Sequence, residues 1–73
     1  MPRLPSVSRR QLIRALKREG WEQSEGREHS IMAHRDRDNV IAVPRHRGDL
    51  GRGLVRRLIT DAGLTVDEFI DLL

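Results

Sequence analysis

The chain has 73 residues, no cysteine and a formal net charge of +3. A chain of this length makes one small domain with a thin margin of stability, and the lack of cysteine excludes disulfides and thiolate metal ligands. No apolar run approaches the roughly 20 residues of a membrane span, and the N-terminal stretch lacks the apolar centre of a signal peptide. We therefore expect a single domain over residues 1–73, a cytoplasmic location and no membrane partner.

Basic charge is concentrated in the first part of the chain. Residues 1–57 hold 14 bases and seven acids, whereas residues 58–73 hold four acids and no base. All the bases except Lys17 are arginines, whose planar guanidinium group binds phosphate in a forked geometry. The distribution favours a surface that binds polyanions, although a solvated charged face would have the same composition.

The first predicted element is a helix from Arg9 to about Glu19. Ser8 is a suitable N-cap and Gly20 a suitable C-terminal stop. One face of this helix is apolar and the other is almost wholly basic. Residues 21–25, WEQSE, follow as a first strand that turns at Gly26.

Two further strands are predicted after this turn. In EHSIMAH, residues 28–34, alternation places His29, Ile31 and Ala33 on one face and Ser30, Met32 and His34 on the other. The polar run 35–39 is typical of a hairpin turn. Residues 39–43, NVIAV, then form a strand of β-branched residues, and Pro44 stops it because proline cannot donate to a ladder.

The remainder of the chain is predicted to be a loop followed by two helices. RHRGDLGRG, residues 45–53, reads as a basic loop, and a second helix runs from about Gly53 to Gly63. Thr65 and Glu68 form a capping-box pattern for a short third helix. Its apolar residues recur with helical spacing, at Val66, Phe69, Ile70 and Leu73.

The order of these elements predicts an α+β fold. Two amphipathic helices are buried most economically on one face of a three-stranded antiparallel sheet, with the other face left open. This α-β-β-β-α order with basic helices is the layout of double-stranded-RNA-binding domains, which contact RNA by shape and phosphate. We expect Trp21 and Met32 to belong to the core.

Four segments in chain order, LIRALKREGW, REHSIM, VPRHR and LVRRLITDAGL, resemble HicA-type toxins, small RNA-cleaving partners of HicB-type antitoxins. The resemblance covers a core of about residues 8–64, to which a C-terminal helix at about 66–73 is added. It implies the RNA-binding-domain-like fold, mRNA cleavage without a cofactor, and inhibition by a HicB-like antitoxin. It also implies that His29, on the second strand, is catalytic. Arg27 and Glu28 stand where the family commonly has Gly-Ser.

The residues themselves are compatible with this chemistry. Metal-independent RNA cleavage needs a base for the 2′-hydroxyl, a proton donor for the leaving 5′-oxygen and cations around the phosphate. Histidine has an ordinary pKa near 6.5 and can perform either proton transfer near neutral pH, while arginines stabilise the developing charge. We expect these residues to bind RNA around His29: Arg9, Arg10, Arg27, Arg45, His46 and Arg47.

The other histidines and Glu28 have less specific interpretations. Glu28 and His29 are consecutive strand residues, so a direct pair between them is not expected. His34 is expected to be structural, near the hairpin, and His46 to contact phosphate or to make a structural hydrogen bond. The histidines are spaced by five and 12 residues with no carboxylate at ligand spacing, which is not a metal-binding pattern, and we expect no metal.

Two other functions remain open at this point. One is a non-catalytic RNA-binding module with the same fold, which would bind RNA with a steep salt dependence and leave it intact. The other is an interaction protein that forms a homo-oligomer through the third helix and binds no nucleic acid.

Overall fold

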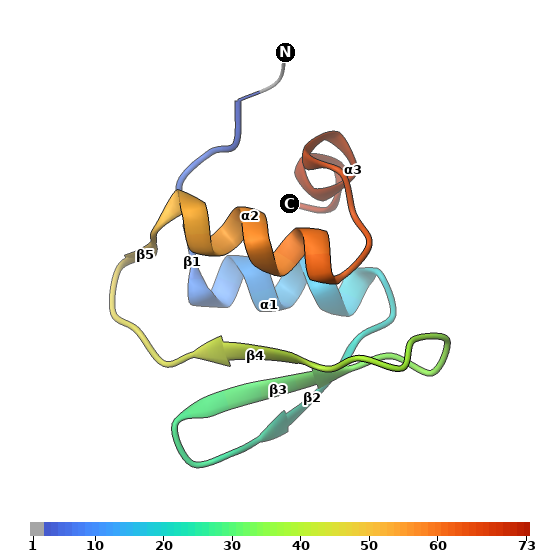
Figure 1. Ribbon diagram of the computed structural model, residues 1–73. Helices are drawn as coiled ribbons and strands as arrows, with labels where there is room; N and C mark the ends of the chain where they lie inside the picture. Colours follow the sequence, from blue (N-terminus) through green and yellow to red (C-terminus); the bar gives the residue numbers. More distant parts are fainter. Residues whose placement is uncertain (1–2) are drawn as a thin grey trace.

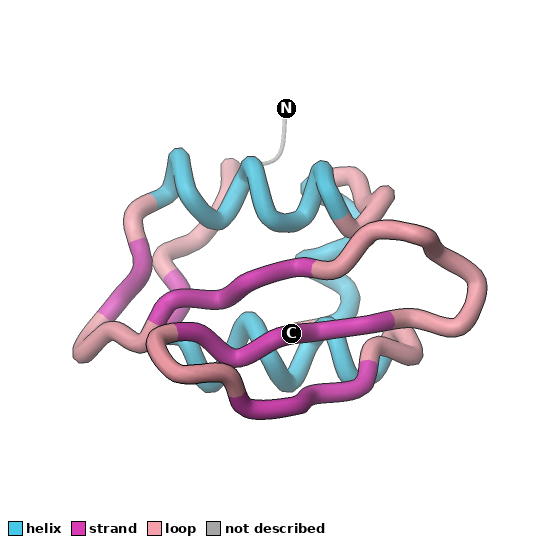
Figure 2. The backbone as a smooth tube through the Cα atoms, turned by 60° about the horizontal axis from the view of Figure 1, so that its bottom comes forward, coloured by secondary structure: helices cyan, strands magenta, loops and turns pink. Residues whose placement is uncertain are grey.

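A computed structural model describes residues 3–73 and has an α+β architecture. Strands β2 (Glu22–Glu25), β3 (His29–Ala33) and β4 (Ile41–Pro44) form an antiparallel sheet in the order β2-β3-β4. Helices α1 (Arg9–Arg18) and α2 (Arg52–Asp61) both lie on one side of this sheet (Figure 1). The other side of the sheet carries no helix, as Figure 2 shows with the strands in front. The predicted α+β, double-stranded-RNA-binding-domain-like arrangement is confirmed.

Helix α1 begins and ends where the sequence predicts. The Ser8 hydroxyl accepts from the Gln11 backbone N–H at 3.2 Å, and the Gln11 side chain accepts from the Ser8 N–H at 2.8 Å. This reciprocal capping satisfies two of the N–H groups that a helix start leaves free. At the other end Gly20 has φ of 103°, a left-handed conformation that favours glycine.

The register of the sheet decides which strand residues face the helices. Ser30 and Met32 of β3 are fully buried, and they lie opposite Val43 and Ile41 of β4, which are also buried. The alternate residues of β3 therefore face the open side, as the period of two requires. The core between the layers includes Trp21 and the apolar stripe of α1, so the prediction that Trp21 and Met32 are core residues is confirmed.

A second, two-stranded sheet was not predicted. Strand β1 (Val7–Ser8) pairs antiparallel with β5 (Asp49–Leu50), and β5 lies within the segment that was predicted to be only a loop. Leu4 adds to this corner, because its carbonyl accepts from Arg52 Nε at 3.1 Å. Two-residue strands are too short to show alternation in the sequence. The buried side chains of Leu4, Val7 and Leu50 extend the core to the N-terminal side of α1.

Helix α3 (Val66–Leu72) closes the helical layer. The predicted capping box is present, and the bond from the Thr65 backbone N–H lowers the pKa of the Glu68 carboxyl. Phe69 is fully buried, and Val66 and Leu72 pack against the core.

The third helix, predicted at about residues 66–73, ends one residue earlier. The helix ends at Leu72, and Leu73 beyond it is 42% exposed. Arg18 of α1 donates to the Leu72 carbonyl at 2.6 Å, which fixes the end of α3 against α1. Within residues 3–73, no helix combines the length and the apolar character needed to cross a bilayer.

The buried position of Phe69 gives a prediction about stability. We expect Phe69→Ala to lower the free energy of unfolding by about 3–5 kcal/mol, because it leaves a large cavity between α3 and the core. Urea unfolding monitored by Trp21 fluorescence measures this loss. Leu73→Ala is the matched control and should change stability by less than about 0.5 kcal/mol; equal effects of the two variants would contradict this packing.

Candidate functional site

His29 is the first residue of β3, and its side chain faces the open side of the sheet. It lies directly opposite Pro44, and the following residue, Ser30, points into the core. The imidazole is partly exposed in a shallow hollow lined by residues of the β2–β3 hairpin, namely Gly26, Arg27, Glu28, His29 and Ile31. Across residues 3–73 no side chain hydrogen-bonds to it, so its nitrogens are free for a ligand.

Ser30 holds the start of β3 in place on the opposite side of the sheet. It is fully buried, and a buried hydroxyl is costly unless it has hydrogen-bond partners. Its Oγ donates to Glu25 Oε2 at 2.9 Å and accepts a hydrogen bond from Arg9 Nη2. The residue beside His29 is thus tied both to β2 and to the first turn of α1.

The Glu25 carboxylate is the centre of this polar cluster. It accepts from Ser30, from Gln23 Nε2 at 2.9 Å and from Arg45 Nη1 at 3.0 Å, and Arg9 Nη2 lies 3.9 Å from Oε1. The Ser30 hydrogen bond and then that of Gln23 hold the pKa of Glu25 below its ordinary value; burial opposes them, and the charges of Arg45 and then Arg9 lower the pKa by less than burial raises it. One carboxylate therefore draws together arginines from α1 and from the loop after β4.

The hairpin is also tied directly to the loop after β4. Arg45 Nη2 donates to the Gly26 carbonyl at 2.7 Å, and the Arg45 backbone N–H approaches the Glu28 carbonyl at 3.4 Å. These contacts bring the basic segment that follows Pro44 to the end of the sheet where His29 lies.

The residues predicted from sequence fall into three neighbouring hollows. Arg27 shares the hollow of His29. A second hollow is lined by Arg9, Arg45, His46 and Arg47, and Arg10 lines a groove along α1. The structure therefore gathers four of the predicted RNA-binding residues in one place, but only Arg27 lies in the same hollow as His29.

Glu28 and His34 lie in different surroundings. Glu28 lines the hollow of His29, with no hydrogen bond between the two side chains in the described chain. His34 Nε2 lies 3.1 Å from the Glu19 carbonyl, and His34 Nδ1 accepts from the Asp36 N–H at 3.1 Å. Its ring also packs edge-on against Trp21, with centroids 5.3 Å apart. Both nitrogens of His34 are thus engaged in structural contacts.

Sequence reasoning missed Glu25, Ser30 and Gln23. The available signal was Ser30, because alternation with Met32 placed a hydroxyl on the core side of the strand, where it needs a polar partner. The identity of that partner depends on the pairing of Glu25 with Ser30 across β2 and β3, which the sequence does not specify.

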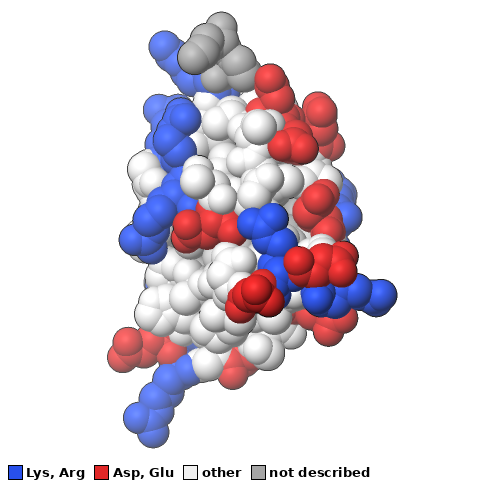
Figure 3. Space-filling model, turned by 45° about the vertical axis from the view of Figure 1, so that its right-hand side comes forward, with Lys and Arg blue, Asp and Glu red and all other residues white. Residues whose placement is uncertain are grey.

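Charge is only partly segregated over the surface. On the face shown in Figure 3, basic side chains follow the upper left border and acidic ones gather at the upper right, while the centre and lower right carry both. The acidic first turn of α3 contains Asp67 and Glu68. Among residues 3–73, no three histidine, aspartate or glutamate side chains gather in the manner of a metal site.

Comparison with known proteins gives one family. A family model described as the HicA toxin of bacterial toxin–antitoxin matches residues 9–64 of the chain. The match spans α1, the three-stranded sheet and α2, and it includes His29 and the arginine cluster. None of the curated proteins matches the chain.

The lowered pKa of Glu25 predicts how the cluster responds to acid. A carboxyl whose pKa is lower in the folded state stabilises the fold above its unfolded value, about 4.3, and loses that contribution as the pH falls through the folded pKa. We expect Glu25→Gln to be less stable than the wild type at neutral pH, with the difference shrinking below about pH 4.

Thermal unfolding across this pH range, with Glu22→Gln on the same strand as control, checks the prediction. Glu68, whose pKa is also lowered, is present in the wild type and in both variants, so its effect on the pH dependence of stability cancels when they are compared. A difference between Glu25→Gln and the wild type that stays constant down to acid pH would contradict the role assigned to the carboxylate.

Proposed function

We propose that this chain, which belongs to the HicA family of bacterial toxin–antitoxin toxins, is a metal-independent endoribonuclease that cleaves mRNA with His29 as its catalytic residue. Membership of the family makes the chain the toxin of such a system, with an antitoxin as its partner. The RNA substrate, the catalytic role of His29 and the HicB-like nature of the antitoxin are our proposal.

The observation that carries the proposal is the combination of an unengaged histidine with converging arginines at one end of the sheet. His29 makes no side-chain hydrogen bond within residues 3–73, whereas His34 is held by two. Arg27 lines the hollow of His29, and Arg45 directly follows the residue paired with it. A general base must be free to reach its substrate, and of these two histidines only His29 meets this condition.

The proposed reaction is an internal transesterification. His29 takes the proton of the 2′-hydroxyl while the 2′-oxygen forms a bond to the adjacent phosphorus. The bond from phosphorus to the 5′-oxygen breaks, and the imidazolium returns a proton to that oxygen. The products are a 2′,3′-cyclic phosphate and a free 5′-hydroxyl. Arg27, which lines the hollow of His29, and Arg45, which follows Pro44 opposite it, would stabilise the additional negative charge on the phosphate oxygens.

The same surface suggests how a HicB-like antitoxin would act. An inhibitor that competes with RNA must cover His29 and offer acidic groups to the arginines around it. If exposed charge pairs dominate that complex, it will weaken as salt is added, because solvent-exposed pairs are screened.

A cleavage assay tests the function. We expect the wild type to cut a mixed RNA in EDTA and His29→Ala, at equal folded concentration, to lose about 100-fold or more of the rate, the range expected for a lost acid–base group. His46→Gln is the matched control, since His46 lies in the neighbouring hollow and should retain cleavage within about tenfold.

Two results would contradict the proposal. Cleavage by His29→Ala at the wild-type rate would remove His29 from the mechanism. RNA binding by both proteins without any product would indicate the non-catalytic RNA-binding module instead.

A further inference from the structure

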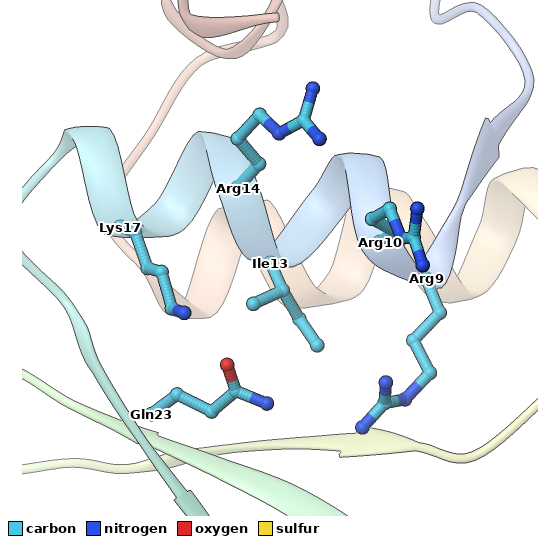
Figure 4. Close-up of a pocket in the computed structure, with 6 residues that line it drawn as sticks. All are labelled: Arg9, Arg10, Ile13, Arg14, Lys17 and Gln23. Carbon is cyan, nitrogen blue, oxygen red and sulfur yellow. The ribbon is translucent and has the colours of Figure 1, made fainter.

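We propose that the groove between α1 and β2 is a second RNA-binding site, which holds the single strand that flanks the cleavage point. This inference rests on the proposed ribonuclease function and names the form of its substrate. The groove has a volume of about 370 Å³ and is lined by Arg9, Arg10, Ile13, Arg14, Lys17 and Gln23. Figure 4 shows the five helix residues along α1: Arg9, Ile13 and Lys17 extend toward the sheet, where Gln23 of β2 lies, whereas Arg10 and Arg14 point away from it.

The charge of the groove is suited to a phosphate backbone. Four of its six lining residues are cations, and no acidic residue lines it. Within residues 3–73, Arg10, Arg14 and Lys17 have neither a side-chain hydrogen bond nor an ion pair, so their charges are free for a ligand. Ile13 forms an apolar floor and is 6% exposed. A positively charged groove that follows the phosphate backbone is a common feature of proteins that bind single-stranded nucleic acid without sequence preference.

Arg9 and Arg45 connect the groove to the hollow of His29. Arg9 lines both the groove and the hollow of Arg45, His46 and Arg47. That second hollow adjoins the hollow of His29 through the bond from Arg45 to the Gly26 carbonyl. Cationic side chains therefore follow one path, from Lys17 along α1, around the hairpin end of the sheet, to His29.

The Glu25 cluster lies at the bend of this path. Its carboxylate contacts Arg9 and Arg45 at the bend and also accepts a hydrogen bond from Gln23, which lines the groove. The same group therefore fixes both the bend and this wall of the groove. The bend is therefore part of the folded structure and does not have to form when a ligand binds.

The path requires a flexible ligand. Gln23 lies opposite the buried Met32 and thus on the helix side of the sheet, whereas His29 faces the open side. A bound strand has to turn around the end of a molecule whose smallest dimension is 17 Å. Nucleic-acid duplexes are stiff over roughly 150 base pairs, so only a single strand can follow both sides. A dinucleotide can occupy the hollow of His29 but cannot reach Lys17.

The test asks whether removing charge from the groove affects the cleavage of a long RNA but not that of a short one. Cleavage of a single-stranded dodecanucleotide and of a dinucleotide is measured for the wild type and for Arg14→Gln/Lys17→Gln. We expect KM for the dodecanucleotide to rise by up to about fivefold for each lost contact, with kcat unchanged and the dinucleotide unaffected. Arg35→Gln/Arg57→Gln removes the same charge from arginines that line none of the three hollows, and it should leave KM unchanged.

A binding measurement separates this inference from the proposed function. With a 2′-O-methyl dodecanucleotide, which cannot be cleaved, the slope of log affinity against log salt should become less steep by about 0.7 for each lost phosphate contact. If the wild type cuts no RNA but the slope is still less steep for Arg14→Gln/Lys17→Gln, the groove binds RNA and the proposed ribonuclease function is wrong. If RNA is cut and neither KM nor the slope changes, the groove proposal is overturned. Loss of antitoxin binding alone in Arg14→Gln/Lys17→Gln, with RNA binding intact, would also overturn it.

Discussion

The register of β3 is the constraint on which the rest of the site depends. A slip of one residue would move every side chain of the strand to the other face and would bury His29 in the core. Met32 specifies the register by its burial, and Ser30 specifies it by its hydrogen bonds to Arg9 and Glu25. A polar residue in a mostly apolar core thus decides that the histidine beside it faces outward.

The same polar cluster connects elements that are distant in the chain. Glu25 of β2 contacts Arg9 of α1 and Arg45 of the loop after β4, so three separate segments meet at the end of the sheet. Each exposed charge pair contributes little stability alone. Their value is positional, because they bring Arg9 and Arg45 together at the end of the sheet where His29 lies. The apolar core, completed by Leu4 on one side and by Phe69 on the other, supplies the stability that such a small fold requires.

Much of this arrangement could be predicted from sequence, and the exceptions have physical reasons. Strong local signals, such as the capping residue Ser8, the alternation around His29 and the Thr65 capping pattern, gave the helices, the sheet and the outward direction of the histidine. The pairing of β1 with β5 and the role of Glu25 were not predicted, because both depend on contacts between distant segments that leave no periodic pattern. The residues predicted to bind RNA around His29 are divided among three hollows, and this division was not predicted because it depends on the sheet's two faces.

The central claim is that this chain cleaves RNA by activating the 2′-hydroxyl next to the broken bond. The most direct measurement uses a single-stranded RNA with one cleavage site, compared with the same strand carrying a 2′-deoxynucleotide at that site, in EDTA. The proposed mechanism requires that the all-ribose strand yields a 2′,3′-cyclic phosphate and a 5′-hydroxyl, and that the substituted strand stays intact at this position. Cleavage of both strands, or products that end in a 5′-phosphate, would contradict it.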